Sequence, residues 1–311
     1  MSRRELSSPP SLTALYPRAV TVPLLRKLPG LGAGSRELPD TELEVRDVAT
    51  DLDHLSDYTD VCGFERMDRL PATYPHIVAF PLAMRIMAER SFPFPVLGLV
   101  HIGNEITQHR PVSPDEPLSV RVRAEGLEPH DRGTQFTMAA EARVGDELVW
   151  DSRNVYLHRS KGGSGGGGER KRREEPAPAQ AHWRVPGDIG RRYGAVSGDR
   201  NPIHLHGWSA KLFGMPRPIA HGMWLKARCL AELEPALPDA FSVGVRFKLP
   251  LFVPAQVAFG GDGDGFEVRD ASSGKPHLSG TISPRDWWLR TLRTVMPAAS
   301  ASWPTVSFIV P

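Results

Sequence analysis

The chain has 311 residues, of which 40% are hydrophobic and 24% charged, and its formal net charge is +2. This length allows two domains of ordinary size, and the near-neutral charge excludes the strong positive field expected of proteins that bind nucleic acid or anionic membranes. We find no apolar run long enough to span a membrane and no secretory signal, so we expect a protein of the cytoplasm. The two cysteines, Cys62 and Cys229, lie far apart and outside any paired motif, which favours packing roles in a reducing compartment.

A glycine-rich and charged segment divides the chain into two parts of similar size. Residues 161–181 contain a Gly/Ser run, the stretch Arg-Lys-Arg-Arg-Glu-Glu and a Pro/Ala-rich end, a composition typical of a flexible linker. We therefore predict an N-terminal domain over residues 36–160 and a C-terminal domain over residues 182–285. Residues 1–35 form an N-terminal extension and residues 286–311 a C-terminal tail, and we expect both to be loosely ordered or to pack on the surface.

Each part shows one apolar helix followed by several strands. The apolar residues cover most of the circumference of each predicted helix, which indicates burial, and the first strand of each part alternates in polarity. In the N-terminal part, the predicted helix and strands cover Leu82–Ala88, Val100–Ile106, Leu118–Ala124, Thr134–Ala142 and Leu148–Leu157. In the C-terminal part, they cover Met223–Leu233, Val243–Leu249, Gln256–Phe259, Phe266–Arg269 and His277–Ile282.

The two parts have the spacing of a diverged repeat. Pro75 and Pro218 are 143 residues apart, and so are Pro111 and Pro254. The first alternating strand of each part lies between these anchors and runs toward the second proline, which should end regular pairing. The pattern predicts an α+β fold made of two similar units.

The stretch between Ser197 and Met223 holds groups suited to acid–base chemistry. It reads Ser-Gly-Asp-Arg-Asn-Pro-Ile-His from residue 197 and Ile-Ala-His-Gly-Met from residue 219. Asp199 and His204 supply a carboxyl and an imidazole, and Gly222 supplies a backbone N–H at the start of the predicted apolar helix. These groups can move a proton and a water beside an activated carbonyl.

The residues between the acid and the imidazole set the local backbone. Pro202 fixes its own φ and biases Asn201 toward an extended conformation. A bent segment of this kind can bring Asp199 and His204 to one face, whereas a continuous helix would not do so at a five-residue step.

This double motif resembles the signature of the MaoC-like, (R)-specific enoyl-thioester hydratases, also called hydratase 2. The specific match covers residues 183–283, and the whole chain resembles the two-domain actinobacterial 3-hydroxyacyl-thioester dehydratases of that family. The resemblance implies a double hotdog, in which each of two repeats wraps a curved antiparallel sheet around one long buried helix.

The resemblance also implies an activity and a set of roles. The expected enzyme is a hydro-lyase of fatty-acid metabolism that interconverts (R)-3-hydroxyacyl and trans-2-enoyl thioesters carried on coenzyme A or acyl carrier protein. In the family's pattern His204 activates the water and Asp199 delivers the proton to C2, while the residues themselves leave open which of the two is the acid and which the base. The unpaired N–H of Gly222 at the start of the helix is expected to hold the thioester oxygen. Asn201, Pro202 and His221 are the expected positioning residues. We expect neither a metal nor another cofactor, because the thioester itself makes the C2 proton labile.

The N-terminal part lacks this machinery. Its segment from Leu70 has no Asp-x-Asn-Pro-x-His, and Phe80-Pro81 stands where we place the start of its helix, so that no N–H is available there. We therefore predict that this half serves as a pocket wall and a tunnel for the acyl tail.

Other interpretations remain open at this stage. The main alternatives are a hotdog acyl-thioesterase and a non-catalytic acyl-binding subunit. His204 and His206 form a weak candidate metal pair, and we interpret His76, His101 and His109 as structural. Among partners we expect an acyl thioester, no nucleic acid and no membrane insertion, and we leave a homodimer open.

Overall fold

The computed structural model describes residues 2–16, 37–160, 178–262 and 264–285. Much of the predicted linker and extension and all of the predicted tail lie outside these ranges. None of the helices in the described ranges is both long and apolar enough to cross a bilayer.

The first half contains two main helices and five strands, preceded by a short strand at the N-terminus. In chain order these are β1 (Ser2–Leu6), β2 (Thr41–Val48), α2 (Leu52–Cys62), α3 (Pro75–Met87), β3 (Leu99–Gln108), β4 (Leu118–His130), β5 (Gly133–Val144) and β6 (Glu147–Arg159).

The second half repeats this order with extra short helices. Its elements are β7 (Ala179–Val185), α4 (Ile189–Ser197), α5 (Pro202–Leu205), α6 (Gly207–Leu212), α7 (Gly222–Leu233), η1 (Glu234–Ala236), β8 (Phe241–Phe247), β9 (Ala255–Asp262), β10 (Gly265–Asp270) and β11 (Pro276–Pro284).

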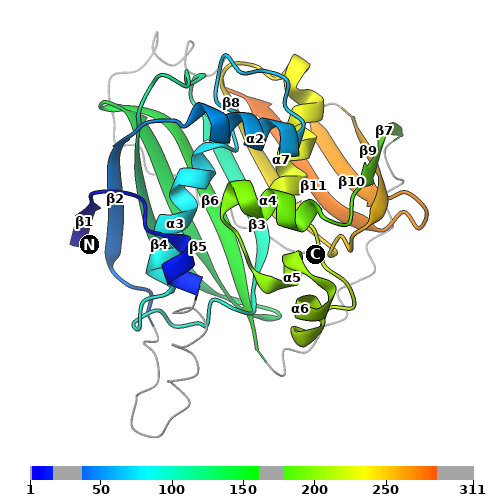
Figure 1. Cartoon of the computed structure of the whole chain (residues 1–311), viewed down its shortest axis with the longest axis horizontal. Helices are drawn as coiled ribbons and strands as arrows, with labels where there is room; N and C mark the ends of the chain where they lie inside the picture. The colour runs from blue at the N-terminus through cyan, green and yellow to red at the C-terminus, as the bar shows by residue number, and fades with distance from the viewer. Residues whose placement is uncertain (1, 17–36, 161–177, 263, 286–311) are drawn as a thin grey trace, which may run out of the picture.

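The described strands form one 11-stranded sheet that both halves share. The strand order is β1-β2-β4-β5-β6-β3-β8-β11-β10-β9-β7, so each half contributes the same internal order on either side of the β3–β8 seam. At the seam the two strands are antiparallel, from Gly103 opposite Arg246 to Gln108 opposite Phe241. Figure 1 shows the sheet curving behind the helices, with β1 and β7 at opposite edges.

The long helices α3 and α7 form the core of the two repeats. Leu82 and Ile86 of α3 and Leu230 of α7 are fully buried, as are the inward-facing Val120 of β4 and Val243 of β8. Alternate strand residues point to this side, so the sheet and the helices shield each other's apolar surface. The predicted α+β double hotdog is confirmed.

The start of the helix in the first half differs from the prediction. Helix α3 begins at Pro75, so Phe80 and Pro81 lie inside it and are not its first residues. The prediction placed the helix start too late because proline usually marks the first turn of a helix, whereas Pro81 lies within this one. Pro75 still leaves the first position without an N–H, as Pro81 would have done.

The N-terminal extension is more structured than the composition suggested. Ser2–Leu6 add β1 to the edge of the sheet in parallel with β2, and Leu15 is 2% exposed within the core. At the start of the second half, β7 begins at Ala179, inside the predicted linker. Main-chain pairing with an existing edge decides both cases, and composition carries little information about it.

Candidate active site

Asp199 follows the end of α4, in a turn that presents its carboxylate. Gly198 ends the helix in the left-handed region, with φ of 72°. The Asp199 Oδ1 atom accepts a hydrogen bond from the backbone N–H of Asn201 at 3.1 Å and another from the Tyr16 hydroxyl at 3.0 Å. These two bonds fix the carboxylate, because both donors converge on the same oxygen.

His204 lies on α5, the short helix that the Asn-Pro pair begins. Asn201 caps it by accepting from the N–H of Ile203 at 3.4 Å, and Pro202 occupies the first turn. The His204 Nδ1 atom is 2.8 Å from the carbonyl oxygen of Ile219. Since a carbonyl only accepts, Nδ1 carries the proton and Nε2 is left to accept one from a water.

His221 and Gly222 stand at the beginning of α7. The His221 Nε2 atom donates to the main-chain oxygen of Asp199 at 2.9 Å, and its ring stacks on that of His204 with centroids 3.7 Å apart. Gly222 is the first residue of the helix, where N–H groups have no partner within the helix. A Cβ at this glycine would come within 2.9 Å of the Phe247 ring, so the site is built around its absence.

Three chemically active groups therefore converge. One ligand-type atom from each of Asp199, His204 and His221 lies within 4.8 Å of those of the other two. His204 and His221 are buried, and the side chain of Asp199 is 29% exposed. This trio could also supply metal ligands, since a main-chain oxygen occupies only one ring nitrogen of each histidine.

The environment favours an ionised acid and neutral rings. Burial alone would raise the pKa of Asp199, but His221, His204 and the two hydrogen bonds to the carboxylate outweigh it and hold the pKa below its usual value. Burial lowers the pKa of His204, against the opposing effect of Asp199, and lowers that of His221 to about 3. At neutral pH both the carboxylate and the His204 ring can accept a proton.

The site opens into a large cavity. A cavity of about 1400 Å³ is lined by Asp199, Asn201, His204, His221 and Gly222. Further lining comes from the first half, namely Phe80, Met84, Met87, His101 and Tyr156. The walls combine a small set of polar groups with apolar side chains, as ligand sites commonly do.

The structure places the sequence-predicted residues unevenly around this cavity. The cavity is lined by Asp199, Asn201, His204, His221 and Gly222. Pro202 is not among the lining residues, and it positions His204 indirectly by starting α5. His206 is exposed and its ring lies 6.1 Å from that of Trp208, so it does not pair with His204. The stacking partner of His204 comes from a segment 17 residues further along the chain.

Sequence reasoning missed other residues near the site. Tyr16 lies in a segment rich in Pro and Ser, and a single aromatic residue there gives no motif signal. His76 and His101, interpreted as structural, line the same cavity, and burial lowers their pKa values to about 4 and 3. His109 lies elsewhere and contacts Asp151 at 2.8 Å.

Comparisons with known proteins agree with this architecture. Residues 170–265 match the model of the MaoC like domain. The chain is 36% identical over 253 residues to 3-hydroxyacyl-thioester dehydratase X of Mycobacterium tuberculosis, covering 79% of this chain and 90% of that protein. A crystal structure of HtdX from the same organism superposes with a TM-score of 0.70 at 34% identity, over 78% of this chain and 100% of that one.

A more distant solved structure shares the fold. The MaoC-like dehydratase of Phytophthora capsici gives a TM-score of 0.61 at 18% identity, over 78% of this chain and 95% of that one. The identity to the mycobacterial relative extends over both halves and nearly its whole length. The chain therefore belongs to the MaoC-like dehydratase family.

Proposed function

We propose that this protein is a hydro-lyase that interconverts (R)-3-hydroxyacyl and trans-2-enoyl thioesters. The observation that carries the proposal is the convergence of Asp199, His204 and the first N–H of α7 on the wall of one cavity. Its relative of 36% identity bears the name 3-hydroxyacyl-thioester dehydratase.

The proton balance fits the resting state of the site. In hydration, His204 Nε2 accepts a proton from a water as the water oxygen bonds to C3 of the enoyl thioester. The proton then passes from the His204 ring to the Asp199 carboxylate, which delivers it to C2, so the pair returns to its starting state. An ionised carboxylate beside a neutral ring can hold the water and take up its proton, and proton transfers of this kind contribute about 10²–10⁴ in rate.

The start of α7 serves the thioester oxygen. Negative charge grows on that oxygen as the nucleophile adds to C3, and the Gly222 N–H lies at the positive end of the helix dipole. Oxyanion donors of this type contribute about 10²–10³ in rate. In the described first half the corresponding position, the first residue of α3, is Pro75, which has no N–H to donate.

The first half instead supplies cavity wall. Phe80, Met84 and Met87 of α3 present apolar side chains to the cavity that Asp199 lines. We assign the acyl tail to this region.

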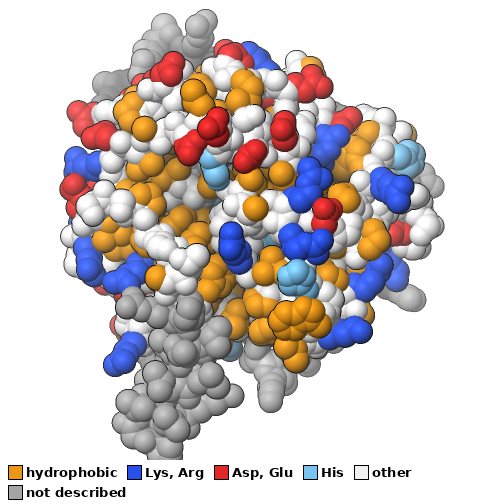
Figure 2. Space-filling view, viewed as in Figure 1, with side chains coloured by type: hydrophobic (Ala, Val, Ile, Leu, Met, Phe, Trp, Pro, Cys, Tyr) orange, Lys and Arg blue, Asp and Glu red, His pale blue; other side chains and the backbone are white. Residues whose placement is uncertain are grey.

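The surface beside the site suits an anionic carrier. Coenzyme A and acyl carrier protein are both anionic, and Arg191, Arg192 and Arg200 are exposed on α4 and the loop after it. Figure 2 shows basic side chains gathered on this part of the helix face, whereas acidic ones gather over α2. Opposite charges would draw either carrier toward the half of the molecule that holds Asp199.

A spectroscopic assay tests the proposal. Purified protein is mixed with trans-2-enoyl-CoA substrates of increasing length, and the conjugated thioester absorbance and free thiol are both followed. Loss of conjugation without thiol release supports hydration, and thiol release would identify a thioesterase. Binding without turnover would identify an acyl-binding subunit.

Paired variants locate the chemistry. We expect Asp199→Asn and His204→Gln to fold normally and to lose most of the activity, by about 10²–10⁴ each. The matched controls are Asp188→Asn, at a helix cap whose side chain makes no capping bond, and His206→Gln, an exposed imidazole two residues from His204. Turnover at the wild-type rate in either site variant contradicts the mechanism.

A further inference from the structure

The N-terminal segment is fixed to the edge of the first half. Strand β1 pairs with β2 from Ser2 opposite Thr41 to Leu6 opposite Val45. Arg3 adds an ion pair, with its Nε atom 2.8 Å from Glu42. These contacts hold residues 2–6 in place at the edge of the sheet.

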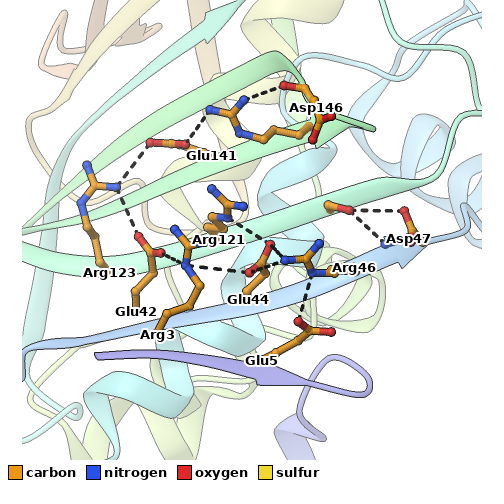
Figure 3. A network of polar contacts seen from close by, with 12 residues as sticks. Arg3, Glu5, Glu42, Glu44, Arg46, Asp47, Arg121, Arg123, Glu141 and Asp146 are labelled. Carbon is orange, nitrogen blue, oxygen red and sulfur yellow. Dashed lines mark hydrogen bonds and ion pairs between the residues drawn. The ribbon is translucent and has the colours of Figure 1, made fainter. Parts of the chain in front are cut away.

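Ion pairs reinforce the same edge. The side chain of Glu44 is 1% exposed and lies 3.0 Å from Arg121 and 3.4 Å from Arg46. Figure 3 shows these groups in one network that runs from β1 across β2 to β4 and β5. A buried carboxylate with several guanidinium partners holds the three edge strands in register, so the position of β1 is determined by charge as well as by main-chain pairing.

From this edge the segment reaches the catalytic loop of the other half. Leu15 is buried in the core, and Leu12 packs so closely on Gly198 that a Cβ there would collide with its Cδ1 atom. The Tyr16 hydroxyl donates to Asp199 Oδ1 at 3.0 Å and accepts from the N–H of Arg200 at 2.6 Å. Leu12 and Tyr16 thus contact the loop that carries the acid.

We propose that Tyr16 is a positioning residue for Asp199, an inference that rests on the function proposed above. Tyr16 and the N–H of Asn201 occupy Oδ1, which leaves Oδ2 on the side of His221, 3.8 Å from its Nε2 atom. Oδ2 is then the oxygen that exchanges a proton with the reacting groups. The N-terminal segment completes the active site in this way, from outside the motif.

The phenol is suited to holding and not to transferring a proton. Burial and the neighbouring Asp199 raise the pKa of Tyr16 far above its usual value, so its O–H remains a donor throughout the working pH range. A permanent donor stabilises the ionised form of the carboxylate. Removing it raises the proton affinity of the Asp199–His204 pair.

The test is the pH profile of Tyr16→Phe, which keeps the ring and deletes the donor. We expect the acid limb of kcat/KM to move to higher pH by roughly one unit, as the loss of one hydrogen bond to a charged group implies. Leu12→Ala weakens the packing of the N-terminal segment on Gly198 but keeps the phenol, so it should give a smaller shift in the same direction. The control is Tyr74→Phe, which deletes a buried phenol bonded to His54 at 3.0 Å, and its profile should match that of the wild type.

A second measurement does not depend on turnover. Protein labelled with ¹³C at aspartate carboxyl groups is titrated, and the Asp199→Asn spectrum assigns the signal. The pKa of Asp199 should rise in Tyr16→Phe and stay unchanged in Tyr74→Phe. An unshifted Asp199 signal with a superimposable pH profile overturns the inference. A wild-type protein without hydratase activity would overturn the proposed function alone, because the carboxyl titration still decides the role of Tyr16.

Discussion

Replacing Gly222 by proline and by alanine separates the N–H of this residue from the space around it. Both substitutions add a Cβ, which would meet the Phe247 ring at 2.9–3.0 Å. Only proline removes the backbone donor. The ratio of the two activities therefore measures the donor, and the steric cost common to both variants largely cancels.

The structure indicates that proline can fit. The first position of a helix tolerates proline because its N–H has no partner within the helix, and α3 already begins with Pro75. His221, the residue before it, has ψ of 138°, in the extended range that a following proline requires. We expect the free energies of unfolding of the two variants to agree within about 1 kcal/mol, since no hydrogen bond within the helix is lost.

The expected magnitude follows from the role given to Gly222. If its N–H stabilises the thioester oxygen in the transition state, Gly222→Pro should have a kcat about 10²–10³ lower than Gly222→Ala, equivalent to roughly 3–4 kcal/mol. Gly222→Ala itself should lose less, because it keeps the N–H, although the Phe247 ring has to shift to admit the Cβ.

The assay is enoyl-CoA hydration at saturating substrate, with thermal unfolding of each variant measured alongside. Equal kcat values in Gly222→Pro and Gly222→Ala, with both variants folded, would refute the assignment of the oxyanion donor to this residue. The thioester oxygen would then have to be held by a later N–H of the first turn or by a side chain.

Three further predictions concern pH and stability. The kcat/KM of the wild type should fall as pH drops through the lowered pKa values of Asp199 and His204, because a protonated pair cannot accept the proton of the water. Lys226→Met should lower the free energy of unfolding by about 1–3 kcal/mol in denaturant titrations, because the buried amine donates to Asn104 and Val243. Burial lowers the native pKa of Lys226, so between that lowered pKa and pH ~10 the unfolded chain binds more protons than the folded one. The wild type should therefore gain stability as pH rises through this window and Lys226→Met should not, and a parallel dependence in both would contradict this. Glu44→Gln should cost about 1–3 kcal/mol, discounted for the partial exposure of its arginine partners, and added salt should shrink the difference from wild type.

The secondary structure was predictable where side-chain pattern decides it. The predicted strand segments fall on β3–β6 and β8–β11, and the predicted helices fall on α3 and α7. These elements were predictable because the spacing of apolar residues along the chain indicates which side chains of a helix or strand are buried. Helix α2 was missed. Its apolar positions are sparse, and its clear signals are the Asp51 cap and the left-handed Gly63 at its ends.

The sequence alone determined the chemical inventory of this protein: a carboxyl and an imidazole separated by an Asn-Pro bend, and a glycine at the head of an apolar helix. Those features are local, so a contiguous motif can carry them. Only the tertiary structure decided that the His221 ring stacks on His204, that both halves line one cavity, and that Tyr16 reaches the acid from the far end of the chain. Contacts across more than 180 residues depend on how strands pair and helices pack, and no short stretch of sequence encodes that geometry.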